Sequence, residues 1–190
     1  MQTTKQALLR RNWTRESYLI STDASLVPIS ELNAALATDL VYWANPLPEE
    51  VMREMLENSL CFGLYDIKPV TAQTNSSIKT KETISEQKRK LIGFARCVTD
   101  FSTFSYLTDV YVLPSYQGEG LGKWLVGCVG EVHDAMPFLR RSMLFTGDWE
   151  RSVPFYERVL GMGLFKGNGE KDGGGPAMMH KQGPGFVRTL

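Results

Sequence analysis

The sequence predicts one α/β domain in which helices flank a mixed β-sheet, and three observations support this fold class. The 190-residue chain is long enough to bury a core of its own without disulfides or metal ions. Short apolar runs rich in β-branched and aromatic residues are interspersed with longer stretches whose apolar residues recur every three or four positions. Consecutive strands precede a strand–helix–strand crossover, an order that combines antiparallel with parallel pairing.

The first part of the chain predicts one strand and two helices. A short β-prone run occupies residues 18–21, and a helical pattern covers 30–41 with Ser30 as its cap. The second helix begins after Pro48, because two glutamates then occupy its first turn and suit the helix dipole. The apolar face predicted for this second helix consists of Val51, Met55 and Leu56.

Two apolar runs, 60–65 and 91–98, predict neighbouring antiparallel strands. The segment between them, 68–90, is rich in Ser, Thr, Lys, Glu and Gln and has almost nothing to bury, so we expect a flexible insertion. Two alternatives are a short surface helix at 85–90 and a regulatory role for the insertion.

The second half of the chain predicts alternating strands and helices. A β-branched and aromatic run stops at Pro114, and Pro137 and Gly161 end the two helices that follow. Apolar residues in steps of three and four mark the first of these helices as amphipathic. In order, we expect a strand at 106–113, a helix at 121–136, a strand at 142–146, a helix at 151–160, a loose glycine-rich stretch at 167–175 and a last edge strand at 177–180.

The composition argues against several classes of partner. The residues are 43% hydrophobic and 22% charged with a formal net charge of zero, so the chain has no electrostatic footprint for nucleic acid or an anionic membrane. No run of about 18 apolar residues occurs, so we expect no membrane span. The N-terminus lacks the apolar core of a signal peptide, and we therefore expect a cytoplasmic protein.

Cysteine and histidine usage argues against a metal site. Cys61, Cys97 and Cys128 lie far apart inside apolar runs, and the chain has two histidines in addition. This pattern lacks metal-ligand spacing and indicates reduced, buried thiols.

Residues 117–122 form the most informative motif. Gly118, Gly120 and Gly122 lie between a predicted strand and a predicted helix. Without Cβ atoms, backbone N–H groups of such a loop point the same way at the helix N-terminus, where the dipole also attracts negative charge. The motif therefore predicts a site for a phosphate or pyrophosphate that needs no side chain.

Two nucleotide-binding motifs match these glycines only in part. A Walker loop needs one more residue between its glycines and a hydroxyl after the lysine, whereas Trp124 follows Lys123. A dinucleotide fingerprint needs glycine where Lys123 stands and belongs after a first strand. The alternative that the glycines only make a tight strand-to-helix turn stays open.

Two stretches of the chain resemble a known family. Gln117, Gly120 and Gly122, after the run 107–114, are similar to the coenzyme A motif of the GNAT superfamily of N-acetyltransferases, which reads Gln or Arg, two residues, Gly, one residue, then Gly or Ala. Residues 155–162, Phe-Tyr-Glu-Arg-Val-Leu-Gly-Met, resemble the family's Phe-Tyr-Glu-x-x-Gly-Phe helix, with three residues instead of two before the glycine and Met in place of the last Phe. The resemblance implies a single N-acetyltransferase domain over 1–190, with a mostly antiparallel central sheet and a strand-loop-helix pyrophosphate site.

The resemblance also implies an activity. The chain would transfer an acetyl group from acetyl-CoA to a primary amine by direct attack, without a metal. The acceptor would be a small-molecule amine or a protein amine, and a homodimer would suit the family. The strand backbone would pair with the pantetheine arm of coenzyme A and the loop would hold its pyrophosphate, which assigns Val110, Tyr111, Val112, Gln117, Gly118, Glu119, Gly120, Leu121, Gly122 and Lys123 to coenzyme A.

Tyr156 is the general acid that the resemblance implies, protonating the departing thiolate. Its alternative role is packing on the face with Val153 and Leu160. A non-catalytic acyl-CoA-binding sensor or interaction module would use the same loop without needing this tyrosine. A nucleotide-binding regulatory domain would instead bind magnesium-ATP and ignore coenzyme A.

Three carboxylates near predicted strand ends are candidates for the general base: Asp109, Asp148 and Glu150. We favour Asp109, because its alternation with Leu107 and Tyr111 places it on their face, where partial burial would raise its basicity. Asp148 alternatively starts the following helix, and a chain of water molecules is an alternative to all three.

Aromatic residues near the expected cleft are the candidates for acceptor binding. Tyr42, Trp43 and Phe104 would provide its walls and hint at an apolar or amphipathic amine. The alternative is that they serve core or lid packing.

Overall fold

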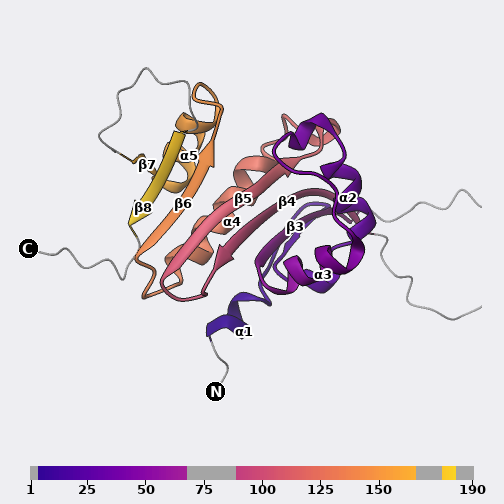
Figure 1. Ribbon diagram of the computed structural model, residues 1–190, viewed down its shortest axis with the longest axis horizontal. Coiled ribbons are helices and arrows are strands. Elements are labelled where there is room, and N and C mark those ends of the chain that lie inside the picture. Colours follow the sequence, from indigo (N-terminus) through magenta and orange to yellow (C-terminus); the bar gives the residue numbers. More distant parts are fainter. Residues whose placement is uncertain (1–3, 68–88, 166–176, 183–190) are drawn as a thin grey trace, which may run out of the picture.

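The computed structural model describes residues 4–67, 89–165 and 177–182. These residues form an eight-stranded mixed sheet with helices on both faces (Figure 1). The strands follow the spatial order β1-β2-β3-β4-β5-β6-β8-β7, and β5–β6 is the parallel pair among antiparallel neighbours. The predicted fold class, a mixed and mostly antiparallel sheet flanked by helices, is confirmed.

The strands span β1 (Asn12–Arg15), β2 (Tyr18–Ser21), β3 (Leu60–Asp66), β4 (Lys90–Thr99), β5 (Phe104–Val112), β6 (Arg141–Thr146), β7 (Gly163–Leu164) and β8 (Ala177–Gln182). The helices span α1 (Thr4–Leu8), α2 (Ile29–Leu36), α3 (Glu49–Glu57), α4 (Leu121–Asp134) and α5 (Ser152–Leu160). Short 3₁₀ turns occur at η1 (Ala24–Leu26), η2 (Asp39–Val41) and η3 (Pro114–Tyr116).

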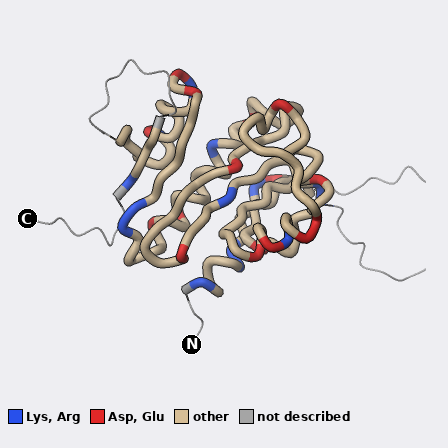
Figure 2. The backbone as a smooth tube through the Cα atoms, viewed as in Figure 1, with Lys and Arg blue, Asp and Glu red and all other residues tan. Residues whose placement is uncertain are grey.

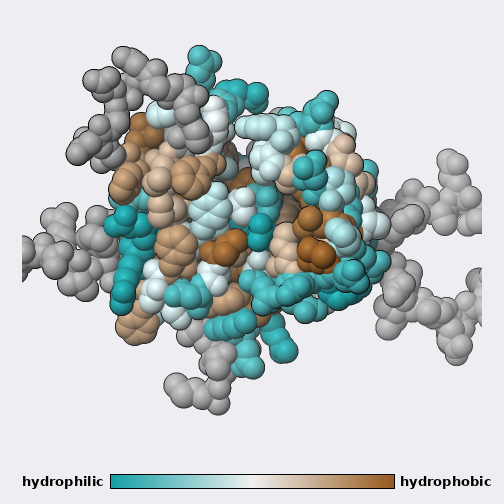
Figure 3. Space-filling view, viewed as in Figure 1, coloured by the Kyte–Doolittle hydropathy of each residue, from teal (hydrophilic) through white to brown (hydrophobic). Residues whose placement is uncertain are grey.

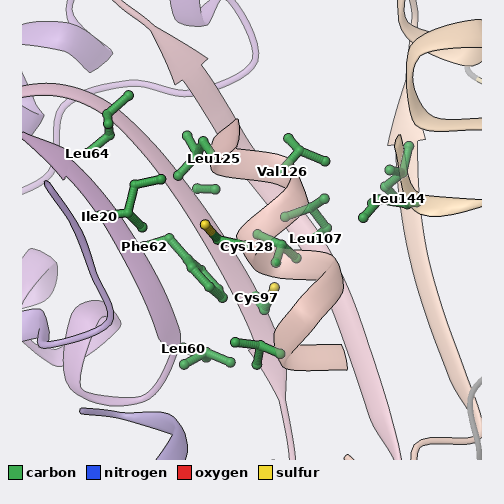
Figure 4. Close-up of a cluster of buried hydrophobic side chains, with 14 of the residues drawn as sticks. Ile20, Leu60, Phe62, Leu64, Cys97, Leu107, Leu125, Val126, Cys128 and Leu144 are labelled. Atoms are coloured by element: carbon green, nitrogen blue, oxygen red, sulfur yellow. The ribbon is translucent and has the colours of Figure 1, made fainter. Parts of the chain in front are cut away.

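Helices bury both faces of the central strands, which explains why β3 and β4 are continuous apolar runs. On one face, α4 and α5 pack against the sheet; Figure 4 shows Leu125 and Cys128 of α4 close to Phe62 of β3. On the other face, α2 and α3 cover a second core that contains Cys61 of β3. Alternate residues of β3 therefore enter different cores.

Some predicted details near the N-terminus are wrong. Ser30 does not cap α2, because the helix already starts at Ile29 after Pro28 without a side-chain cap. The predicted helix over 30–41 ends at Leu36, where the hydroxyl of Thr38 donates to the carbonyl of Ala35 and closes the last turn.

The apolar face predicted for α3 is also displaced. The helix buries Met52 and Leu56, whereas Val51 is exposed and Met55 is half-buried. A short helix that packs on one face of the sheet buries a narrow stripe, and its rotation is set by the tertiary contact rather than by the sequence pattern.

At the other end of the sheet, β8 is not the edge strand, because β7 pairs along its outer side. The sequence reasoning missed β7 and, at the opposite edge, β1, a four-residue strand in which exposed residues alternate with half-buried ones. Residues 68–88 of the predicted insertion and the glycine-rich stretch at 167–175 lie outside the described residues, and Lys90 already belongs to β4.

The three cysteines are buried and unpaired. Within the described residues, no helix combines the length and the apolar composition that a membrane span requires.

His133 lies inside the core on α4. Its Nε2 atom is 2.9 Å from the hydroxyl oxygen of Ser105 and 3.8 Å from the sulfur of Cys97, so it links the helix to both central strands. Burial lowers the pKa of His133 to about 4. The positive charge of Lys181 also lowers this pKa, whereas the negative charge of Asp134 raises it.

The lowered pKa of His133 predicts a loss of stability in mild acid. Between pH 6.5 and 4 the unfolded chain binds a proton that the folded chain does not, so the free energy of unfolding falls as the pH falls through this window. We expect His133 to contribute about 2 kcal/mol to the decrease between pH 7 and pH 5, measured by urea unfolding. In His133→Gln that part of the pH dependence should be absent; equal pH dependence in both proteins would contradict this account.

Candidate active site

A β-bulge in β5 shapes the candidate site. Arg96 on β4 lies opposite Thr108, whereas Phe94 lies opposite Tyr111, so β5 carries one more residue than its partner over this interval. Asp109 lies there with a φ of 55°, in the left-handed region where glycine is favoured. Such a bulge bends its strand and re-aims the side chains that follow.

The predicted position of Asp109, on one face with Leu107 and Tyr111, is wrong because of the bulge. Leu107 enters the core beneath α4 and α5, and Tyr111 enters the core beneath α2 and α3. These two residues therefore lie on opposite faces, and Asp109 cannot share a face with both. The extra residue reverses the alternation on which the prediction rested.

Past Tyr106, along the segment of β5 that contains the bulge, β5 and β6 separate. The parallel pairing ends at Tyr106 and Met143, although β5 continues to Val112 and β6 to Thr146, and the two strands diverge in Figure 1. A cavity of about 450 Å³ occupies this opening. Its walls come from the segment after η2, from β5 and β6, from the loop after β6 and from α5.

Asp109 lines this cavity and forms an ion pair. Its Oδ2 accepts from Nε of Arg96 at 2.6 Å, and the two side chains are 12% and 16% exposed. Its Oδ1 accepts from the indole nitrogen of Trp43 at 3.4 Å and from the hydroxyl of Thr108 at 3.3 Å. Arg96 also donates to the hydroxyl of Ser59 at 3.2 Å, so the carboxylate is held in one position.

The other two candidate bases occupy different places. Asp148 lines the cavity, and its Oδ1 accepts from the backbone N–H of Arg151 at 2.8 Å where α5 begins. The bond closes the turn that leads into α5, which begins at Ser152, one residue after the start that the alternative predicted. Glu150 is exposed and lies outside the cavity wall.

Tyr156 reaches the same cavity from α5. Its ring packs edge-on against Phe155 at 5.1 Å between centroids, and both rings contact the core. Burial raises the pKa of Tyr156 to about 12. The hydroxyl stays protonated at neutral pH and can donate a proton to an anion that forms in the cavity.

The glycine loop lies where β5 ends and α4 begins. Gly118 and Gly120 adopt left-handed conformations with φ of 90° and 74°, and residues 118–120 are exposed. No side chain in the described part of the chain caps α4, so its first backbone N–H groups stay available to an anion. The loop therefore presents uncapped backbone N–H groups at an exposed helix N-terminus, an arrangement that attracts an anion.

The β1–β2 hairpin supports this loop. Tyr18 donates to the carboxylate of Glu119 at 2.7 Å, and Nη2 of Arg15 donates to the Glu119 carbonyl at 2.9 Å. The Arg15 guanidinium also lies 5.2 Å from the ring centre of Trp124, on the first turn of α4. The side-chain nitrogen of Gln117 donates to the Val112 carbonyl at 2.8 Å and ties the loop to β5.

The remaining residues assigned to coenzyme A divide into two groups. Val110 lines the cavity, and Lys123 is exposed beside the loop. The side chains of Tyr111, Val112 and Leu121 are buried in the cores, so only their backbone groups can reach a ligand.

Of the predicted acceptor residues, Tyr42 and Trp43 line the cavity. Phe104 lies at the first residue of β5, beside Arg141, and outside the cavity wall. The structure thus joins Tyr42, Trp43, Asp109 and Tyr156 in one cavity, and it leaves Phe104 out. Across residues 4–67, 89–165 and 177–182, His, Cys, Asp and Glu side chains form no group of three or more that would hold a metal ion.

Sequence reasoning missed three supporting residues. Arg96 is the one charge inside the apolar run 91–98, and that isolation is a signal for a buried ion pair. Arg15 and Tyr18 contact the loop across more than a hundred positions of sequence, and no local pattern marks such a contact.

Comparisons with known proteins agree with this geometry. The model of the Acetyltransferase (GNAT) family matches residues 47–162. A protein of Gibberella zeae, whose name assigns it provisionally to the acetyltransferases, is 40% identical over 176 residues, 92% of this chain and 94% of that protein.

Solved structures show the same fold. One is a GNAT-family protein of Xanthomonas campestris pv. campestris, 28% identical, with a TM-score of 0.54, covering 76% of this chain and 84% of that one. Another is a GNAT family acetyltransferase from Elizabethkingia anophelis with acetyl-CoA bound, 13% identical, with a TM-score of 0.52, covering 88% of this chain and 99% of that one.

The loop geometry predicts opposite effects of alanine at two of its glycines. Gly120→Ala should lower the free energy of unfolding by about 1 kcal/mol, because a side chain is strained at a φ of 74°. Gly122→Ala is the matched control: an added Cβ meets Val112 at an ordinary 3.8 Å, and alanine favours the helix. Urea unfolding of both variants checks this, and equal destabilisation would contradict the assigned loop conformation.

Proposed function

The chain belongs to the Acetyltransferase (GNAT) family, and we propose that it transfers the acetyl group of acetyl-CoA to a primary amine by direct attack. One observation carries the proposal: β5 lines the cavity that Asp109 and Tyr156 reach, and the glycine loop follows the same strand. A ligand with a pyrophosphate at one end and a thioester at the other can therefore lie along that strand.

The backbone of β5 offers the contact between these two ends. Past Tyr106 the strand has no partner in β6, so its backbone groups on that side are not used by the sheet. The amide groups of a pantetheine arm can take the place of the missing strand, as an added strand does. The pyrophosphate would then meet the N–H groups of the loop at the start of α4.

The cavity residues supply the proton transfers of the reaction. The amine nitrogen attacks the thioester carbonyl carbon, and the carbon–sulfur bond breaks as the carbonyl re-forms. The hydroxyl of Tyr156 gives its proton to the departing thiolate, and the attacking nitrogen loses one proton. Orientation along β5 and stabilisation of the thiolate would account for most of the acceleration.

Asp109 is our candidate for the group that receives the proton from the amine. Arg96 binds the Oδ2 atom of Asp109, whereas within the described residues Oδ1 accepts only two long hydrogen bonds, from Trp43 at 3.4 Å and from Thr108 at 3.3 Å. Oδ1 is therefore the atom that can accept a proton. The ion pair also gives Asp109 a structural role in the bulge. Water molecules in the cavity are therefore the alternative route for this proton.

A non-catalytic acyl-CoA-binding module is the competing function. It would use the loop and β5 but would have no need of a protonated hydroxyl inside the cavity. Tyr156 distinguishes the two functions, because its loss affects only an enzyme.

We expect Tyr156→Phe to bind coenzyme A as the native chain does and to lower kcat by about a hundredfold or more, because the proton donor is removed. Calorimetric titration with coenzyme A measures the first quantity, and thiol release from acetyl-CoA with a panel of amines measures the second. Tyr65→Phe is the control, because that hydroxyl is buried away from the cavity and has no hydrogen-bond partner in the described residues.

Three results would count against the proposal. Binding of magnesium-ATP in place of coenzyme A would favour a nucleotide-binding domain. Coenzyme A binding without thiol release for any amine would favour the binding module. An unchanged kcat in Tyr156→Phe would remove Tyr156 from the mechanism.

A further inference from the structure

We infer that the acceptor end of the cavity selects a primary amine that carries a second positive charge, such as a diamine. This inference rests on the proposed acetyl transfer and names the acceptor class of the same site. It is carried by exposed aromatic rings, an uncompensated carboxylate and the absence of cationic side chains from the cavity wall in the described residues.

Aromatic rings form the mouth of the cavity. Tyr42 and Trp43 follow η2 and pack edge to face at 5.0 Å between ring centroids. They are 73% and 44% exposed, and Phe145 on β6 is 49% exposed on the other side of the opening. Figure 3 shows apolar residues on this face over β5, β6 and β8. Exposed ring faces at the mouth of a cavity attract a cation.

Tyr42 reaches across the opening. A Cβ atom placed on Gly147, at the end of β6, would lie 3.4 Å from the Tyr42 hydroxyl oxygen. The ring thus extends from the α2–α3 side of the molecule to the β6 side. An amine that enters between β5 and β6 must pass this ring.

The charges of the cavity wall are negative. Asp109 is compensated by Arg96 at 2.6 Å, so it adds little net charge. Asp148 is held through Oδ1 by a backbone N–H, and its charge faces no cation in the wall, as far as the described residues define it. Among the described residues that line the cavity, none is Lys or Arg. Figure 2 shows acidic positions on β5 and in the loop after β6 on either side of the opening.

The aromatic rings and the Asp148 carboxylate together favour an acceptor with two amino groups, one that reacts and one that stays charged. The attacking amine must be neutral when it reaches the thioester, so the carboxylate and the rings cannot hold its charge at that moment. A second ammonium, with a pKa of about 10.4, stays charged near neutral pH and can remain at the rings and Asp148. An acceptor that carries a carboxylate in place of the second ammonium would be repelled by the charge of Asp148.

Three acceptors of matched length test this inference. They are 1,5-diaminopentane, 5-amino-1-pentanol and 6-aminohexanoate, each with five methylenes next to the reacting amine. We expect kcat/KM per reacting amine to be about tenfold higher for the diamine than for the amino alcohol, and lowest for the amino acid. Added salt should reduce the difference between the diamine and the amino alcohol.

Variants locate the selectivity. Asp148→Asn keeps an acceptor for the Arg151 backbone N–H but removes the charge, and it should lower the ratio of diamine to amino alcohol several-fold. Tyr42→Leu should lower that ratio, whereas Tyr42→Phe keeps the ring face and should preserve it. Because Tyr42 is mostly exposed, we expect both of its variants to fold.

Each outcome decides between the claims. Equal kcat/KM for the diamine and the amino alcohol overturns the inference. The same holds if the ratio of these two kcat/KM values is unchanged in both Asp148→Asn and Tyr42→Leu. If other amines are acetylated and these three are not, the inference fails and the proposed function stands. Absence of transfer to any amine overturns both.

Discussion

The ion pair between Arg96 and Asp109 holds the bulge on which the candidate site depends. A left-handed backbone costs a non-glycine residue about 1–2 kcal/mol, and the fixed carboxylate offsets this cost through its bonds to Arg96 and Trp43. The extra residue bends β5, and the strand leaves β6 after Tyr106. Continued pairing would fill the space that the cavity now occupies.

The same strand leads to the glycine loop, where we propose that the pyrophosphate binds. At its end, η3 and the glycine loop lead directly into α4, and the loop's exposed N–H groups face solvent rather than a capping side chain. The β1–β2 hairpin, from the far edge of the sheet, holds this loop through Arg15 and Tyr18. Two features, the bulge and the supported loop, therefore lie along β5, which is the path that we propose for acetyl-CoA.

Local sequence patterns predicted most elements, because helices cover both faces of the sheet and leave clear apolar runs and stripes. They predicted the glycine loop, since Gly118 and Gly120 are needed at positive φ. They could not predict the bulge, because Asp109 adopts a positive φ, and the usual sequence signal for a positive φ is a glycine. Nor could they predict β1, because only Trp13 among its four residues is apolar and its pairing with β2 is a tertiary contact. Phe104 was misplaced because the sequence does not show where β5 and β6 separate, and Phe104 lies at the end of β5 that is paired with β6.

The most direct test of the central claim is a titration of the ¹⁵N-labelled chain with coenzyme A, followed through the backbone amide resonances. If acetyl-CoA lies along β5 with its pyrophosphate on the loop, the largest changes will occur in the amides of 110–112 and 117–123. Changes confined to other parts of the sheet, or no changes at saturating coenzyme A, would contradict this account.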